Sequence, residues 1–191
     1  MNTIVTSRED ILHSSRELIR RQGWEAVNIR SVAAACGVSV GSIYNYFSSK
    51  AELVGATVES IWHEIFHFPQ EPTAFADTLA CVSWLYERMR YGSEKYPGFF
   101  TLHALSFGPE KADGKQRMYQ TWDHVVRRLS AVLRQDPRVR PDAFQAHFTA
   151  DQFAQVLFSL LLSALLRQDY DPNAVLEIIR RTIYTTNEEE A

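Results

Sequence analysis

Residues 28–53 carry the polar side chains whose types and spacing point most clearly to a chemical task, which is hydrogen bonding to a DNA duplex. Ser42 can bond a base or a phosphate, and Asn45 can pair with adenine through two bonds. Val40 offers methyl groups to thymine, and Gly41 lets the backbone come close to DNA. Residues 40–47 lack Arg, Lys, Gln and Glu, so we expect few direct base contacts and a large contribution from DNA shape.

Such side chains need a short helix held by a fixed turn, and the flanking residues predict one. Asn28 is a good N-cap for a helix whose inner face carries Val32 and Cys36. Gly37 stands where a helix ends in the left-handed conformation, and Ser39 can cap the next helix. This spacing predicts a helix-turn-helix.

The second of these helices, expected over residues 40–47, has two distinct faces. Ile43 and Phe47 are four residues apart and should face inward. Gly41, Tyr44 and Asn45 should face outward, toward a major groove.

The pattern Gly37-Val-Ser-x-Gly-x-Ile-Tyr-x-Tyr-Phe-x-Ser-Lys-x-Glu-Leu53 resembles the DNA-binding signature of TetR-family transcriptional repressors and covers about a quarter of the chain. Serine at 42 and tyrosine at 46 replace the commoner threonine and histidine. The resemblance implies phosphate contacts from Tyr44, Tyr46 and Lys50, and phosphate positioning by Asn28 and Arg30. It also implies base or backbone contacts from Val40, Gly41, Ser42 and Asn45.

Helical periodicity continues through the chain of 191 residues, and we expect an all-α protein of about nine helices. Residues 1–53 should form a three-helix DNA-binding domain, and residues 54–191 a helical domain for ligand binding and dimerisation. Capping boxes are expected at Thr6 with Glu9 and at Ser49 with Glu52. The further helices are expected at residues 49–67, 73–95, 115–134, 142–168 and 173–186, with an exposed loop at 108–114.

Composition and charge fit a globular protein that binds DNA through local geometry. The net charge is −3, but residues 1–55 hold six basic and five acidic residues, so the acidic excess lies elsewhere. Two cysteines in apolar patterns favour a reduced, cytoplasmic protein, and we expect no signal peptide. The uncharged residues 152–166 are too few to span a bilayer, so no membrane association is expected.

An enzymatic alternative comes from His63-Glu-Ile-Phe-His67, which has the H-E-x-x-H spacing of zinc peptidases. Two histidines at this spacing share a helix face, and Glu64 could act as a general base. Pro69 interrupts the helix soon after, and no third ligand stands at a recognised spacing. We therefore expect no metal and no cofactor. A helical interaction protein without DNA affinity is a further alternative.

The TetR resemblance implies a homodimer that a small-molecule effector releases from its operator DNA. A cluster of aromatic residues with a few polar groups is a candidate site for a lipophilic or aromatic effector. Its members are Trp84, Arg88, Tyr91, Phe99, Phe100, His103, Phe107, Tyr119 and Trp122.

The apolar residues of the last two helices are the candidate dimer interface. The helix of residues 152–166 carries apolar side chains on nearly every side, more than one core-facing stripe requires. The alternative is that both helices are ordinary core. The expected interface residues are Phe153, Val156, Leu157, Ser159, Leu160, Ser163, Ala164, Ile178 and Ile179.

Overall fold

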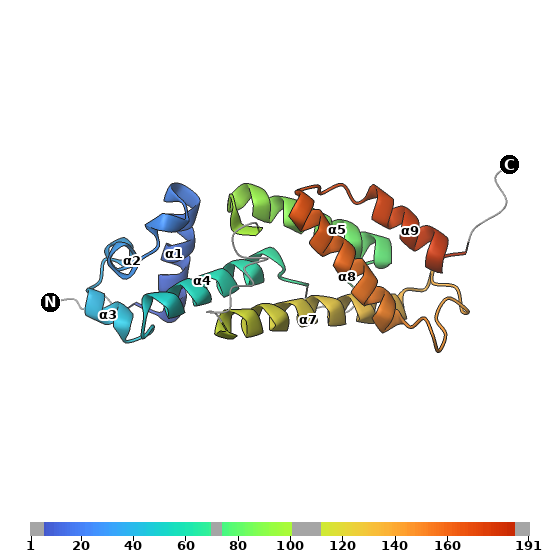
Figure 1. The fold of residues 1–191 in the computed structure, drawn as a ribbon, viewed down its shortest axis with the longest axis horizontal. Helices are drawn as coiled ribbons and strands as arrows, with labels where there is room; N and C mark the ends of the chain where they lie inside the picture. Colours follow the sequence, from blue (N-terminus) through green and yellow to red (C-terminus); the bar gives the residue numbers. More distant parts are fainter. Residues whose placement is uncertain (1–5, 70–73, 101–111, 186–191) are drawn as a thin grey trace. The chain divides into compact units, whose positions relative to one another are not determined.

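The computed structural model describes residues 6–69, 74–100 and 112–185, without the side chains of 112–121, and this part of the chain is all-α (Figure 1). Its α-helices are α1 (Arg8–Gln22), α2 (Ile29–Cys36), α3 (Val40–Tyr44), α4 (Lys50–Ile65), α5 (Thr78–Lys95), α7 (Ala112–Gln135), α8 (Ala150–Arg167) and α9 (Asn173–Ile183), with a 3-10 helix, η1 (Trp24–Ala26). The chain divides into two compact units, Met1–Ile65 with Gly92–Arg117, and Phe66–Tyr91 with Met118–Ala191.

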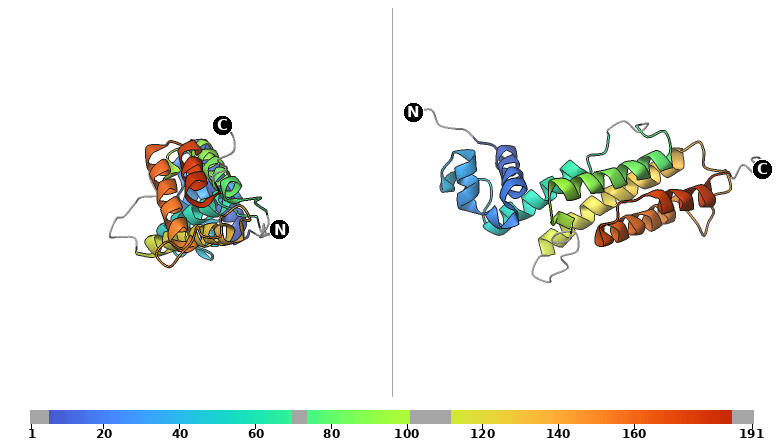
Figure 2. Two further views of the ribbon diagram at one scale, coloured as in Figure 1. Left: turned by 90° about the vertical axis from the view of Figure 1, so that its right-hand side faces the viewer. Right: turned by 90° about the horizontal axis from the view of Figure 1, so that it is seen from above.

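The first unit is built around α1, which packs against α2 and α4, while α2 packs against α3. Its core includes Ile11, Ile43, Phe47 and Leu53, all completely buried. The inward orientation expected for Ile43 and Phe47 is therefore confirmed. Figure 2 shows the helices of this unit from two further directions.

The N-terminus of α1 is capped one residue later than the sequence indicated. The Ser7 hydroxyl accepts from the Asp10 amide at 3.1 Å, and the Asp10 carboxylate accepts from the Ser7 amide at 3.0 Å. The expected box of Thr6 with Glu9 is wrong because α1 begins at Arg8, which makes Ser7 the N-cap.

A buried carboxylate, Asp136 at the end of α7, joins three elements of the second unit. It accepts from the backbone amide and hydroxyl of Thr78 at 2.7 and 2.6 Å, and from the Tyr184 hydroxyl at 2.5 Å. Burial opposes ionisation of Asp136, but these donors outweigh it and hold its pKa below the usual value. Asp136 thus fixes the start of α5 and the residue after α9.

Several helix ends differ from their expected positions because side chains cap or stop the helices. Thr149 and Gln152 form a capping box, so α8 begins at Ala150 rather than at 142. The last helix ends at Ile183, because Tyr184 turns to extended backbone and pairs with Val139. Helix α5 begins at Thr78, where Asp136 binds the first amide.

Three further helices have boundaries that are shifted by a few residues. Helix α4 spans Lys50–Ile65 instead of 49–67, and α3 ends at Tyr44 instead of 47. Helix α7 begins at Ala112, so the end of the loop expected at 108–114 is helical, and the rest of that loop lies outside the described residues.

Both cysteines are free thiols, with Cys36 half-buried and Cys81 buried. Burial raises the pKa of the Cys81 thiol to about 12. None of the helices in the described ranges is long and apolar enough to cross a bilayer.

Candidate DNA-binding surface

The first helix of the motif, α2, is fixed at its start by Asn28. The Asn28 side-chain oxygen accepts from the amides of Arg30 at 3.1 Å and Ser31 at 3.0 Å. The Ser31 hydroxyl in turn accepts from the Asn28 amide at 3.2 Å, which completes a capping box. Asn28 is thus the expected N-cap, and its side-chain oxygen is engaged within the helix rather than turned toward a ligand.

The turn between α2 and α3 has the geometry that the sequence predicted. Gly37 adopts φ 68° and ψ 28°, a left-handed conformation that is unfavourable for residues with a Cβ. Its amide lies within bonding distance of the Ala34 carbonyl oxygen, at 3.1 Å. The Ser39 hydroxyl then accepts from the Ser42 amide at 3.1 Å and caps α3. These caps set the direction of the second helix.

Helix α3 presents a row of residues away from the core. Tyr44 is 52% exposed, Val40 is 40% exposed, and Gly41 and Asn45 are also exposed. Ser42 is half-buried, and its hydroxyl lies 2.9 Å from the Ser39 hydroxyl. The outward orientation expected for Gly41, Tyr44 and Asn45 is therefore confirmed, and we call residues 40–42 and 44–46 the recognition surface.

Two predicted phosphate contacts lie just beyond α3. Tyr46 is 39% exposed, but its hydroxyl donates to the Thr6 carbonyl at 2.6 Å. Lys50 is exposed at the start of α4, and the Ser49 hydroxyl accepts from the Glu52 amide at 3.1 Å. The Glu52 carboxylate accepts from the amide and the hydroxyl of Ser48, each at 2.7 Å.

The six basic residues of the N-terminal module, residues 1–55, fall into two groups, those that form ion pairs and those that do not. Arg16 pairs with Glu9 at 2.9 Å, and Glu17 pairs with Arg20 at 2.7 Å and with Arg21 at 3.5 Å. In the described part of the chain, by contrast, no carboxylate pairs with any of the three remaining cations of the module. These three are Arg8, Arg30 and Lys50. Unpaired cations near the helix-turn-helix suit phosphate binding.

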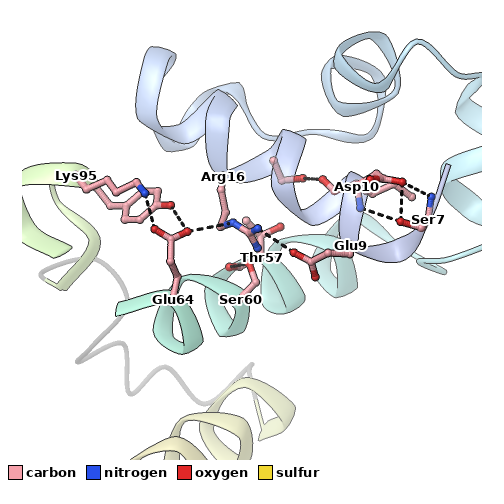
Figure 3. Close-up of polar contacts among 11 residues, drawn as sticks. Ser7, Glu9, Asp10, Arg16, Thr57, Ser60, Glu64 and Lys95 are labelled. Carbon is pink, nitrogen blue, oxygen red and sulfur yellow. Dashed lines mark hydrogen bonds and ion pairs between the residues drawn. The ribbon is translucent and has the colours of Figure 1, made fainter. Parts of the chain in front are cut away.

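A polar cluster centred on Glu64 of α4 joins α1 to the end of α5. The Glu64 carboxylate contacts Lys95 Nζ at 2.6 Å, the Tyr96 hydroxyl at 3.0 Å and Arg16 Nε at 3.4 Å (Figure 3). Burial opposes ionisation of Glu64, but the bonds from Lys95 and Tyr96 outweigh it and lower its pKa. No local sequence pattern indicates this cluster, because each partner of Glu64 is 31 or more residues away from it along the chain.

The same cluster overturns the zinc-peptidase interpretation. Helix α4 ends at Ile65, so His67 lies beyond the helix whose face it would have to share with His63. Glu64 is engaged by Lys95 and Tyr96 and is not available as a general base. Across the described ranges, no three His, Cys, Asp or Glu side chains form a group that could hold a metal ion.

The candidate effector residues are divided between the two units. Phe99 and Phe100 are buried in the first unit, where Trp62 lies 5.2 and 5.6 Å from their ring centroids. In the second unit, Trp84 packs 4.9 Å from Phe68, and Arg88 lies 4.2 Å from the Tyr91 ring centroid.

The rest of the candidate effector set is only partly described. Trp122 packs 5.7 Å from Phe158 of α8, with the planes of the two rings tilted by 59°. His103, Phe107 and the side chain of Tyr119 lie outside the described residues. The contacts of the described residues therefore do not join the candidate effector residues into one site.

The candidate interface residues also fall into two groups. Val156, Ser159 and Ile178 are exposed, and Leu160 and Ser163 are half-buried. A second group lies in the core of the single chain, and its members are Phe153, Leu157, Ala164 and Ile179. Leu166, 55% exposed, was not among the expected residues but extends the apolar surface of α8.

The helix-turn-helix and the helical unit that follows it define a class, the helical DNA-binding regulators. Residues 11–57 match the family model described as "Bacterial regulatory proteins, tetR family". The nucleoid occlusion factor SlmA of Vibrio cholerae is 25% identical over 143 residues, covering 70% of each chain. Residues 11–57 therefore carry a DNA-binding domain of the TetR family, and the chain is similar to TetR-family transcriptional regulators.

Solved structures share this fold across nearly the whole chain. A transcriptional regulator from Rhodococcus sp. Rha1 matches with a TM-score of 0.66 and 17% identity, covering 95% of this chain and 100% of that one. The regulator FadR of Bacillus subtilis, solved in complex with stearoyl-CoA, matches with a TM-score of 0.66 and 15% identity over 93% and 100%. At these identities the likeness is one of fold.

Proposed function

We propose that this regulator is a repressor that binds a palindromic operator as a homodimer and that a lipophilic or aromatic effector releases it. In this proposal residues 1–53 read DNA, and residues 54–191 bind the effector and form the dimer. The proposal places the protein in the cytoplasm, in keeping with its two free thiols.

The proposal rests on the exposure of the recognition surface. This surface lies on α3, whose direction is fixed by Gly37 at the end of α2 and by Ser39 at the start of α3. Tyr44 and Asn45 stand free of the core, while Ile43 anchors the helix from its opposite face. A helix positioned in this way can enter a major groove with its outer residues against base edges and phosphates. Because it carries no Arg, Lys, Gln or Glu, DNA shape should supply much of the specificity.

A dimer is supported by the apolar side chains exposed on α8 and α9. Val156 is 47% exposed and Ile178 is 42% exposed, and large apolar side chains in a group often mark a protein interface. A twofold dimer would present two recognition surfaces to half-sites about 34 Å, or a multiple of it, apart.

The effector class is supported by aromatic side chains rather than by a bound molecule. Trp84 and Trp122 are half-buried on α5 and α7. Arg88, which lies over the Tyr91 ring one turn after Trp84, is a cation that could orient an acidic group. FadR, which shares the fold, was solved with stearoyl-CoA, a lipophilic ligand with charged groups. Release would require the effector to favour a dimer whose recognition surfaces no longer match the groove spacing.

Selection of genomic DNA fragments by the purified full-length protein tests the proposal. Recovery of a few fragments that share a palindrome supports an operator-specific repressor, and aromatic or acyl compounds should then lower their retention. A mutational scan of the palindrome should show that central base pairs each contribute less than about 3 kcal/mol. Failure to retain DNA at low salt would favour a helical interaction protein.

A second function is suggested by SlmA, whose name describes it as a nucleoid occlusion factor. A protein of that kind would occupy many sites rather than a few promoters. The same selection separates the two functions, because widely dispersed fragments would favour the second.

A further inference from the structure

The start of α1 is fastened to the residues that directly follow α3. The Tyr46 hydroxyl donates to the Thr6 carbonyl oxygen at 2.6 Å, although the two residues are 40 positions apart. The Arg8 guanidinium carbon lies 5.1 Å from the centroid of the Phe47 ring, which is completely buried. A hydrogen bond and a cation–π contact therefore hold residues 6–8 next to the recognition surface.

The bond to Thr6 restricts what Tyr46 can do. A phenol carries one proton, and phosphate oxygens of DNA only accept hydrogen bonds. While Tyr46 donates to the Thr6 carbonyl, it cannot also donate to a phosphate. A direct phosphate contact from Tyr46 would need this bond to break, whereas a positioning role leaves it intact.

Arg8 is placed as a phosphate-binding group would be. It is exposed, and in the described residues no carboxylate forms an ion pair with it. Its acidic neighbours are engaged elsewhere, because Glu9 pairs with Arg16 and Asp10 accepts from the amide and hydroxyl of Ser7 (Figure 3). A guanidinium held over a ring face keeps its in-plane N–H groups for other acceptors.

We propose that Arg8 is a further phosphate contact of the DNA complex and that Tyr46 is the positioning residue that holds it there. The inference rests on the proposed DNA binding and adds two specific roles to it. The ligand is a backbone phosphate, so the contact contributes to affinity for any duplex and carries no base specificity.

The salt dependence of binding tests the role of Arg8, with a random-sequence duplex of about 30 base pairs as the probe. Arg8→Ala should reduce the slope of log K against log salt by about 0.9 per bound subunit. Between about 50 and about 200 mM NaCl, this is about a 3.5-fold smaller loss of affinity per subunit. Arg20→Ala is the matched control, because Arg20 is an exposed cation of the same helix that pairs with Glu17, and its slope should equal that of the wild type.

Tyr46→Phe tests the positioning role, because it removes one hydroxyl and no charge. If Tyr46 positions Arg8, the variant lowers the salt slope in the wild-type background and has no further effect on top of Arg8→Ala. A neutral phosphate contact would instead weaken binding equally in both backgrounds and leave the slope unchanged, which would overturn the inference.

The outcomes separate this inference from the proposed function. If the wild type binds DNA with salt dependence but Arg8→Ala behaves like Arg20→Ala, the inference is wrong and DNA binding stands. If the wild type fails to bind the duplex at low salt, both are wrong. Unchanged circular dichroism and Tm for the variants establish that the slopes report on folded protein.

Discussion

The indole of Trp24 stacks on the ring of Phe99, with the ring centroids 5.8 Å apart and the planes 15° from parallel. Trp24 begins η1, immediately before the helix-turn-helix, and Phe99 follows the end of α5. Phe99 also lies 5.2 Å from Trp62 of α4. The segment before the helix-turn-helix, helix α4 and the residues that follow α5 therefore share one aromatic core.

We expect a measurable coupling between Trp24 and Phe99. Trp24→Leu and Phe99→Leu should each lower the free energy of unfolding, and the double variant should lose about 0.5–1.5 kcal/mol less than the sum, because the stacking contact is lost only once. Urea unfolding of the four proteins measures the coupling. Strictly additive losses would mean that the stack contributes no energy of its own.

Gly41→Ala should separate stability from DNA affinity. A Cβ at position 41 would meet only the Ser39 hydroxyl oxygen, at 3.7 Å, so the variant should fold and gain up to about 1 kcal/mol of stability. Its affinity for operator DNA should fall roughly tenfold if the α3 backbone approaches the duplex closely.

Gly55→Ala is the control for this substitution, because a Cβ at this position of α4 meets nothing within 4 Å. It should gain stability in the same way and keep its affinity. Fluorescence anisotropy and thermal unfolding measure both quantities, and equal affinities for the two variants would argue against close approach at Gly41.

Asp136 should make the protein sensitive to acid. Its pKa is lowered in the folded state despite burial, so its contribution is complete above the unfolded pKa of about 3.9 and is lost as the pH falls through the folded pKa. Asp136→Asn should lower the free energy of unfolding at neutral pH by about 2–4 kcal/mol and flatten its decrease below about pH 5.

Asp142→Asn is a matched control for Asp136, because the Asp142 side chain is 74% exposed and only forms a surface pair with Arg140. It should change stability by less than about 0.5 kcal/mol. Denaturant unfolding at several pH values makes the comparison. An unchanged pH profile for Asp136→Asn would show that its network does not control acid stability.

Charges placed on the exposed apolar residues of α8 and α9 should dissociate the proposed dimer. Val156→Glu combined with Ile178→Glu would bring like charges into an interface that holds apolar side chains, and the protein should sediment as a monomer. Ala80→Glu adds charge at an exposed position of α5 and should leave the assembly unchanged. A wild-type monomer, or a dimer that survives the double substitution, would place the interface elsewhere.

Local signals explain how much of the fold could be predicted from the sequence. Asn28, Gly37 and Ser39 act on backbone groups within a few residues of themselves, and all three cap or end helices as expected. The start of α5 has one local signal, because the Asp77 carboxylate accepts from the Ala80 amide at 2.8 Å. The bond from the Thr78 amide to Asp136, 58 residues away, has no local signature. The capping box of Thr149 and Gln152 does have a local signature, but the apolar pattern of the chain extends beyond it toward residue 142.

The candidate site was predictable to a similar extent. The outward face of α3 follows from helical periodicity, so Tyr44 and Asn45 were expected to be exposed. The bond from Tyr46 to Thr6 joins distant positions and has no local signature, so the family resemblance predicts only a phosphate contact for Tyr46. Unpaired cations such as Arg8 become visible only once the ion pairs of their neighbours are known.

Footprinting of the full-length protein on a genomic fragment that it retains is the most direct test of the central claim, which is that the outward face of α3 reads DNA. The wild type should protect two half-sites related by a twofold axis and separated by about one helical turn or a multiple of it. Tyr44→Ala combined with Asn45→Ala should abolish this protection while leaving the fold intact, because both side chains are exposed. Protection that persists in this variant would contradict the account.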